Sequence, residues 1–196
     1  MNGDAPAILA AVDHGDRLAE MQARLIERDM LRRGSTIGMI SSAAGLGWEA
    51  NMSTLRQLLE TTDWDAAVQW MVDNNHADYF HTKQAVCAYV ASQAYPMLKR
   101  GIRINAICPG PTDTPLAQKN PELWLGFGAD YREETGTQAS TPLDQAFPLV
   151  FLCSDAAVAI NGQTLVSDLG YLAAGVTGVY PGATPIAEML LGRSAG

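Results

Sequence analysis

The sequence predicts an α/β protein with a mostly parallel, partial doubly wound sheet flanked by helices. Three short apolar runs, near residues 36–42, 102–108 and 163–168, indicate buried strands. Helical patterns separate these runs, and strands that alternate with helices are typical of parallel sheets. With 196 residues, 47% of them hydrophobic, the chain is expected to form one domain with its own core.

The composition excludes several classes of function. A formal net charge of −8 and the lack of any Lys/Arg-rich run argue against nucleic acid or anionic membranes as partners. No apolar run is long enough to cross a bilayer and the first residues lack a signal-peptide pattern, so we expect a cytoplasmic protein. The histidines are scattered and the cysteines unclustered, which predicts no metal site and no disulfide framework. The cysteines are interpreted as buried apolar residues: Cys87, Cys108 and Cys153.

The N-terminal part is the least decided by its pattern. Residues 1–16 contain an apolar stretch that fits either a short strand or a loose lead-in. From Asp16 to Arg33 apolar residues recur at helical spacing, so we expect a helix capped by Asp13 or Asp16 and closed by Gly34.

A long segment, residues 46–78, follows the first strand and predicts two short helices. Ser53 or Thr54 is expected to cap the first helix, and Asp63 the second. Its large side chains either cover a hydrophobic substrate pocket or pack against each other or another subunit. They are Trp48, Trp64, Trp70 and Met71.

Tyr79 and Lys83 carry the clearest chemical signal, because residues four apart share one face of a helix. A tyrosine with its ordinary pKa of about 10 is a poor acid or base at neutral pH. A fixed ammonium beside the phenol lowers that pKa and makes it useful in proton transfer. Ser42, at the end of the first strand, could hold a carbonyl oxygen beside the same phenol. The pattern suits hydride chemistry at an alcohol or ketone, although such a pair also arises by chance on an amphipathic helix.

The remaining elements follow from local patterns. Small and apolar residues around the helix that runs to Lys99 predict burial on more than one face. Residues 115–141 predict a loop with short helical pieces, aromatic side chains and flexible glycines. A helix is expected from Pro142 to Cys153, and the tail 171–196 contains a possible short helix at Pro185–Leu191. The tail either forms an arm onto a neighbouring subunit or is mobile.

The order of these motifs resembles the short-chain dehydrogenase/reductase family from about Arg33 to Gly170. The motifs are Ser-Ser-Ala-Ala-Gly at 41–45, Tyr-x3-Lys at 79–83 and Ile-Asn-Ala-Ile-Cys-Pro-Gly at 104–110. The long insert resembles the branch of bacterial 3α-hydroxysteroid dehydrogenase/carbonyl reductase. The resemblance implies a Rossmann-like fold and a dimer built on the helix before the first strand together with the Tyr79 helix.

The resemblance also implies roles for single residues. Tyr79 would be the general acid or base, Lys83 would lower its pKa and bind the nicotinamide ribose, and Ser42 would orient the carbonyl. A NAD or NADP cofactor is implied, with the nicotinamide lined by Pro109, Gly110, Thr112 and Thr114. Contacts to an apolar alcohol or ketone are expected from the insert and the lid-like segment 115–141, through Trp48, Trp124 and Phe127.

Two features of the family are not found in the sequence. No Thr-Gly-x3-Gly-x-Gly turn for the cofactor pyrophosphate precedes Arg33, and no Asn-Asn-Ala-Gly element occurs. Asp13 is a loose match to the family's fourth catalytic residue. Gly45-Leu-Gly47-Trp-Glu-Ala50 fits a short dinucleotide pattern, but Gly45 is already explained by the serine motif. We therefore expect a single truncated domain over residues 1–196, with an apolar edge and face that another segment or subunit must cover.

Three functional hypotheses remain open from the sequence. The chain is an NAD(P)-dependent oxidoreductase subunit in a homo- or hetero-oligomer, or a cofactor-free partner subunit that stabilises a complete homologue. The third hypothesis is that the chain is a cofactor-independent dehydratase or isomerase that uses Ser42, Tyr79 and Lys83. The three intact residues favour an enzyme, while the missing glycine turn argues against cofactor binding by this chain alone.

Overall fold

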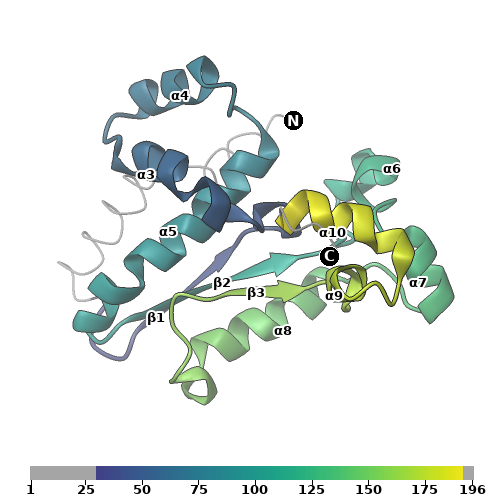
Figure 1. Ribbon diagram of the computed structural model, residues 1–196. Coiled ribbons are helices and arrows are strands. Elements are labelled where there is room, and N and C mark those ends of the chain that lie inside the picture. The colour runs from purple at the N-terminus through teal and green to yellow at the C-terminus, as the bar shows by residue number, and fades with distance from the viewer. Residues whose placement is uncertain (1–29, 192–196) are drawn as a thin grey trace.

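The fold is built on a parallel sheet of three strands in the order β1-β2-β3 (Figure 1), seen in a computed structural model that describes residues 30–191. The strands are β1 (Thr36–Ile40), β2 (Arg103–Pro109) and β3 (Thr164–Ser167). Thr36 pairs with Arg103, and Ala106 pairs with Thr164. The three predicted strands are thus confirmed to within two residues at each end. The central strand, β2, is the most buried.

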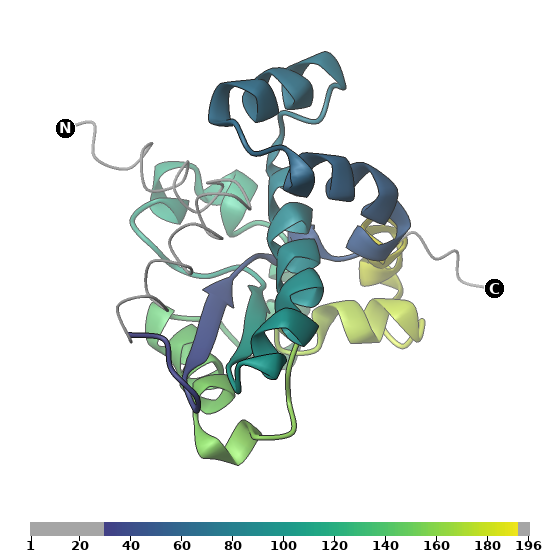
Figure 2. The same cartoon turned by 90° about the vertical axis from the view of Figure 1, so that its left-hand side faces the viewer.

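Helices cover both faces of the sheet (Figures 1 and 2). Side chains alternate along β2, so Ile104 and Ala106 pack with residues of α5 (Tyr79–Lys99). On the other face, the Arg103 guanidinium donates to the carbonyl of Leu152, near the end of α8 (Pro142–Cys153). The fold class and both of these helices were therefore predicted correctly. Thr141 and Asp144 form a reciprocal capping box at the start of α8.

The insert forms two helices, of which the first packs on α5 and the second packs on the first. After the short turns η1 (Ala43–Gly45) and η2 (Trp48–Asn51) come α3 (Met52–Glu60) and α4 (Trp64–Asp73). Asp63 caps α4 as predicted, since its carboxylate accepts from Ala66 N–H at 2.9 Å. The predicted cap at Ser53 or Thr54 is wrong, because α3 already begins at Met52.

Packing within the insert accounts for two of its four large side chains. Met71 is buried with Leu58 and Ala67, and Trp70 packs against this cluster. These contacts bury apolar surface inside the chain. The structure therefore favours packing of Trp70 and Met71 within the insert over the alternative that they cover a substrate pocket.

The second half of the chain adds short elements at the carboxyl end of the sheet. Residues 115–141 contain η3 (Ala117–Lys119), α6 (Pro121–Trp124) and α7 (Ala129–Thr135), in agreement with the predicted loop of short helical pieces. The turn η4 (Asp155–Ala157) leads from α8 toward β3. The tail contains α9 (Tyr171–Val176), which was not predicted, η5 (Pro181–Ala183), and α10 (Thr184–Leu191), which was.

The described part of the tail packs on its own chain. One buried cluster combines tail residues with the residues after β1, with α5 and with β2; it contains Ala43, Leu46, Cys87, Cys108, Tyr171, Leu172, Ala183, Ala187 and Leu190. Up to Leu191 the tail therefore contributes helices that complete the core beside η1.

The N-terminal predictions fall mostly outside the described residues, which begin at Met30. In the described part, residues 30–34 form bends and a turn, so the predicted helical structure is wrong for residues 30–33. Arg32 N–H donates to Ser35 Oγ at 3.0 Å, and Gly34 has the positive φ of +92° expected for a closing glycine. Within residues 30–191, no helix has the length and apolar character needed to cross a membrane.

Exposed apolar surface of the expected kind is present within residues 30–191. In this part of the chain β1 is an edge strand, and its Ile40 side chain is 53% exposed. The outer side of α8 presents three apolar side chains at helical spacing, Leu143, Phe147 and Val150, each more than 60% exposed. These side chains face away from the sheet that α8 covers.

Candidate active site

Ser42, Tyr79 and Lys83 converge at the carboxyl end of the sheet. Ser42 follows β1 and caps η1, where its hydroxyl accepts from Ala44 N–H at 3.2 Å. Tyr79 is the first residue of α5, and Asp78 fixes that start by accepting from His81 N–H at 2.9 Å. One turn later, Lys83 Nζ lies 5.5 Å from the centroid of the Tyr79 ring.

The protonation of the phenol is set by burial and by Ser42. Burial raises the pKa of Tyr79 above its ordinary value of 10.0, and a hydrogen bond with the Ser42 side chain partly offsets this. The lowering of the Tyr79 pKa expected from the sequence is not observed, because burial of the phenol prevails. Tyr79 is therefore protonated at neutral pH, which suits a proton donor.

Lys83 is a half-buried cation. Burial lowers its pKa from 10.5, while the nearby thiols of Cys87 and Cys108 act in the opposite direction. Within residues 30–191 its ammonium makes no ion pair, and its contact is with the Tyr79 ring. An ammonium in this position has hydrogen-bond donors left for a ligand.

A close contact between η1 and α5 holds Ser42 near Tyr79. The Ser41 hydroxyl donates to the Lys83 carbonyl at 2.8 Å. A Cβ atom on Gly45 would lie 2.6 Å from Ser41 Oγ and 2.7 Å from the Lys83 carbonyl oxygen, so only glycine fits. The Gln84 side chain adds a second link: it accepts from Asn51 Nδ2 at 2.8 Å and donates to the Leu46 carbonyl at 3.2 Å. Sequence reasoning missed Ser41 and Gln84, and only Gly45 in the serine motif signalled this contact.

The turn after β2 lies at the same end of the sheet. Gly110 N–H donates to the Ser167 carbonyl at 3.0 Å, and a Cβ atom on Gly110 would lie 2.9 Å from Asp168 Cβ. The Thr112 hydroxyl donates to the Gly110 carbonyl at 3.0 Å, and the Thr114 hydroxyl accepts from Ala117 N–H at 3.1 Å. Both threonine hydroxyls therefore stabilise the turn that follows Pro109.

Of the three predicted substrate contacts, only Trp124 reaches the candidate catalytic residues. Its ring packs edge-on against Tyr79, with centroids 5.2 Å apart. Trp48 and Phe127 instead pack against the buried cluster that includes the tail, and Phe127 contacts Tyr171 with centroids 5.0 Å apart. The lid-like segment thus places the Trp124 ring against the phenol, while its Phe127 ring attaches the segment to the buried cluster.

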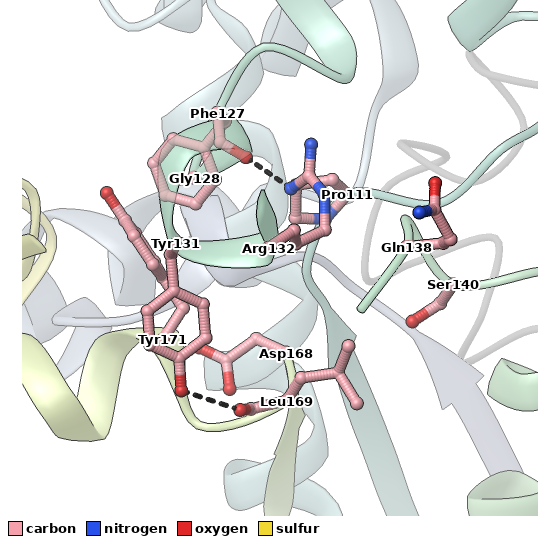
Figure 3. A pocket seen from close by; sticks show the side chains of 10 residues that line it. All are labelled: Pro111, Phe127, Gly128, Tyr131, Arg132, Gln138, Ser140, Asp168, Leu169 and Tyr171. Atoms are coloured by element: carbon pink, nitrogen blue, oxygen red, sulfur yellow. Dashed lines mark hydrogen bonds between the residues drawn. The ribbon is translucent and has the colours of Figure 1, made fainter. Parts of the chain in front are cut away.

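A separate shallow pocket lies between α7 and the end of β3 (Figure 3). The Tyr131 hydroxyl donates to the Leu169 carbonyl at 3.1 Å. The Arg132 guanidinium donates to the carbonyls of Phe127, at 2.7 Å, and Leu125. None of Ser42, Tyr79 and Lys83 lines this pocket, so these contacts serve to hold the lid-like segment in place.

Two other sequence patterns can be weighed against the site. Gly47, in the short dinucleotide pattern, has a φ of +72° and packs against the Leu190 carbonyl of α10, which leaves no room for a phosphate. A second Tyr-x3-Lys pair, Tyr95 and Lys99, lies at the far end of α5 with Lys99 Nζ 5.7 Å from the ring centroid. Tyr95 is 72% exposed, so the spacing alone does not make a site. Among the described residues, no group of three His, Cys, Asp or Glu side chains could hold a metal ion.

Comparison with known proteins places this geometry in context. A family profile described as Enoyl-(Acyl carrier protein) reductase matches residues 61–172, more than half of the chain. An uncharacterised oxidoreductase of Bacillus subtilis is 36% identical over 93 residues, which cover 45% of this chain and 30% of that protein. A 3β-hydroxysteroid dehydrogenase of Mediterraneibacter gnavus is 31% identical over 114 residues, covering 48% of this chain and 41% of that protein.

The fold has a counterpart among solved structures. The 3α-hydroxysteroid dehydrogenase from Pseudomonas sp. B-0831, solved in complex with NADH, superposes with a TM-score of 0.56 at 23% identity. The superposition covers 72% of this chain and 57% of that one. The matched region spans less than half the length of the two curated relatives above.

Proposed function

Since the chain belongs to the short-chain dehydrogenase/reductase family, we propose that it carries the catalytic residues of an NAD(P)-dependent oxidoreductase. The proposed reaction interconverts an alcohol and a ketone on an apolar substrate. The observation that carries this proposal is the convergence of Ser42, Tyr79 and Lys83, with a hydrogen bond between the first two side chains and the ammonium over the phenol ring.

The residues present fit the nicotinamide riboside part of such a cofactor. The Lys83 ammonium is half-buried and has no ion pair within residues 30–191, so it is free to donate to ribose hydroxyls. The turn that starts at Pro109 and Gly110 lies at the carboxyl end of β2, where open α/β sheets bind ligands. Lys83, Pro109 and Gly110 would therefore hold this part, while Thr112 and Thr114 shape the turn. NAD(P)H, when bound, supplies the hydride.

In the reduction, Tyr79 donates the phenolic proton to the carbonyl oxygen of the substrate. Its raised pKa keeps that proton in place at neutral pH. Ser42 would donate a hydrogen bond to the same oxygen and so orient the carbonyl. The positive charge of Lys83 stabilises the phenolate that remains on Tyr79 after the proton has left. Trp124, packed on the Tyr79 ring, would exclude water from one side of the reacting carbonyl.

Dimerisation belongs to the same proposal. α5 presents apolar side chains outside the core: Phe80 is 45%, Tyr95 72% and Leu98 54% exposed. A second copy, or a longer homologue, could cover them through the same helix.

One sequence observation favours a second candidate. The 196 residues contain no Thr-Gly-x3-Gly-x-Gly segment, which is the usual support for the cofactor pyrophosphate. Without nucleotide, the same three residues could transfer protons in a dehydration or isomerisation, or the chain could stabilise a complete homologue. Nucleotide binding separates these alternatives from the oxidoreductase.

The test combines native mass spectrometry with calorimetric titration of NADH and NADPH and with turnover of a panel of apolar ketones. The proposal expects bound nucleotide and a turnover that Tyr79→Phe lowers by about 100-fold or more. Tyr95→Phe is the matched control, since Tyr95 has the same spacing to a lysine on the same helix. A complex that binds neither nucleotide would contradict hydride transfer, and equal activity of the two variants would place the chemistry elsewhere.

A further inference from the structure

Two thiols that lie 21 residues apart in the sequence meet beneath the candidate active site. The Sγ atoms of Cys87 and Cys108 are 3.7 Å apart, and both side chains are fully buried. Cys87 lies one turn beyond Lys83 on α5, and Cys108 directly precedes Pro109 on β2. A disulfide bond is about 2.05 Å long, so the two sulfurs would need to approach by about 1.7 Å.

A chain of hydrogen bonds directs the two sulfurs toward each other. The Ser41 hydroxyl donates its proton to the Lys83 carbonyl, which leaves its oxygen to accept from the Cys87 thiol at 3.2 Å. With the Cys87 proton engaged in this way, the Cys87 sulfur is left as the acceptor for the Cys108 thiol.

The surroundings also make the two thiols unequal. The hydrogen bond from Cys108 lowers the pKa of Cys87 against the effect of burial, and Ser41 and the Lys83 ammonium lower it further. The same hydrogen bond and burial raise the pKa of Cys108. Cys87 is therefore the thiol that ionises more readily, and the thiolate is the form that reacts with oxidants.

We propose that Cys87 and Cys108 form a redox-active thiol pair, which a hydroperoxide converts into an intrachain disulfide. The Cys87 thiolate attacks the terminal peroxide oxygen, the O–O bond breaks, and Cys87 becomes a sulfenic acid while the leaving oxygen takes up a proton. The Cys108 sulfur then attacks the Cys87 sulfur, the S–O bond breaks, and water leaves with the Cys108 proton. With hydrogen peroxide, two thiols and one peroxide give one disulfide and two waters.

A disulfide between Cys87 and Cys108 would connect two segments of the candidate active site. It would join the helical turn after Lys83 to the strand end before Pro109. It would also remove the Cys87 thiol proton from Ser41, the residue next to Ser42. Cys153, the third cysteine, lies near Gly38 on the other side of the sheet and serves as an internal comparison.

The sequence allows a direct test, because trypsin separates the three cysteines. Cys87 lies in the peptide 84–99, Cys108 in 104–119 and Cys153 in 133–193. The full chain is treated with hydrogen peroxide in native buffer, alkylated after denaturation and digested. The expected result is a linked peptide pair that contains Cys87 and Cys108, a mass lower by two hydrogens before digestion, and complete reversal by dithiothreitol.

Variants and conditions keep the test decisive and independent of any enzymatic activity. Cys153→Ser should still form the link, and Cys108→Ser should leave a sulfenic acid on Cys87 that dimedone traps. Because folding brings the thiols together, the same treatment in urea should give mixed pairs that include Cys153. Full alkylation of Cys87 and Cys108 after native treatment would overturn the proposal, as would a link that forms only in urea.

Discussion

The Lys83 ammonium lies 5.5 Å from the centroid of the Tyr79 ring, and α5 repeats this relation at its far end, where Lys99 Nζ lies 5.7 Å from the Tyr95 centroid. The two pairs share spacing and helix, but only the first has Ser42 on the phenol and Trp124 on the ring. Their comparison therefore separates the effect of the site from the effect of the spacing.

We expect Lys83→Met to lower the turnover of the oxidoreductase by about 100-fold, because the phenolate formed on Tyr79 loses its neighbouring positive charge. Lys99→Met removes the same charge from the same helix and should leave turnover within about twofold of the unchanged protein. Steady-state rates of the two variants, with circular dichroism to confirm folding, check this expectation. Equal losses in both variants would show that the charge acts on the helix and not on the site.

The pH dependence should differ between the two directions of the reaction. Reduction needs a protonated Tyr79, and its pKa is raised above 10.0, so the reduction rate should stay level through neutral pH and fall only above about pH 10. Oxidation needs the phenolate, so its rate should rise over the same range. The pKa of Lys83 is lowered from 10.5, so its charge is lost at a lower pH than that of a free lysine.

Ser42→Ala tests whether Tyr79 is the group whose titration sets this pH dependence. The Ser42 hydrogen bond lowers the pKa of Tyr79, and its removal should shift the rise in the oxidation rate to higher pH. Ser53→Ala changes an exposed serine on α3 and should not move the profile. Rate profiles from about pH 6 to about pH 11 measure this, and a shift to lower pH in Ser42→Ala would contradict the assignment.

Much of the fold could be predicted because its strands and helices are marked locally. The apolar runs of β1, β2 and β3, the Asp63 cap and the Pro142 start of α8 are signals of a few adjacent residues. α9 was missed because its small residues carry no clear helical period, and it forms by burying Tyr171 and Leu172 against distant parts of the chain.

The residues of the candidate site were predictable where a local motif marks them, and not where the contact joins distant segments. Ser42, Tyr79 and Lys83 were found because each belongs to a motif with fixed spacing. The pairing of Cys87 with Cys108 and the contact of Trp124 with Tyr79 join segments that only the folded chain brings together. The pKa of Tyr79 was predicted in the wrong direction, since sequence gives the distance along a helix but not the burial of the phenol.

Gly45→Ala should impair both stability and activity. Its new Cβ would lie 2.6 Å from Ser41 Oγ and 2.9 Å from Cys87 Sγ, which forces η1 away from α5 and Ser42 away from Tyr79. We expect a loss of about 1–3 kcal/mol in the free energy of unfolding, as for other overpacked sites, and a lower turnover in the remaining folded protein.

Gly34→Ala is the control for this change. Gly34 has a positive φ of +92°, and no atom of the described residues lies within 4 Å of the place that a Cβ would take, so alanine there costs backbone strain alone. Urea unfolding should show a loss for both variants, but turnover should fall only in Gly45→Ala. Normal turnover of folded Gly45→Ala would show that the contact does not position Ser42.

Leu169→Gly should stabilise the protein. Leu169 has a φ of +58° and is 55% exposed, so the leucine bears the strain of a left-handed backbone and buries little surface. Glycine removes the strain but increases the entropy of the unfolded chain, which leaves a net gain of up to about 1 kcal/mol. Leu165→Gly, within β3, should instead lower the free energy of unfolding in urea. A loss in both variants would show that the Leu169 side chain contributes more than its exposure suggests.

The pairing of β1 with β2 also governs how the chain can fold while it is being made. Thr36 pairs with Arg103, which is 103 − 36 = 67 positions later in the chain. At a synthesis rate of about 5–20 residues per second, roughly 3 to 13 seconds pass before the ribosome reaches the first residue of the partner strand. During that time none of the strands that the structure describes is available to pair with β1, so its apolar residues depend on other segments for cover.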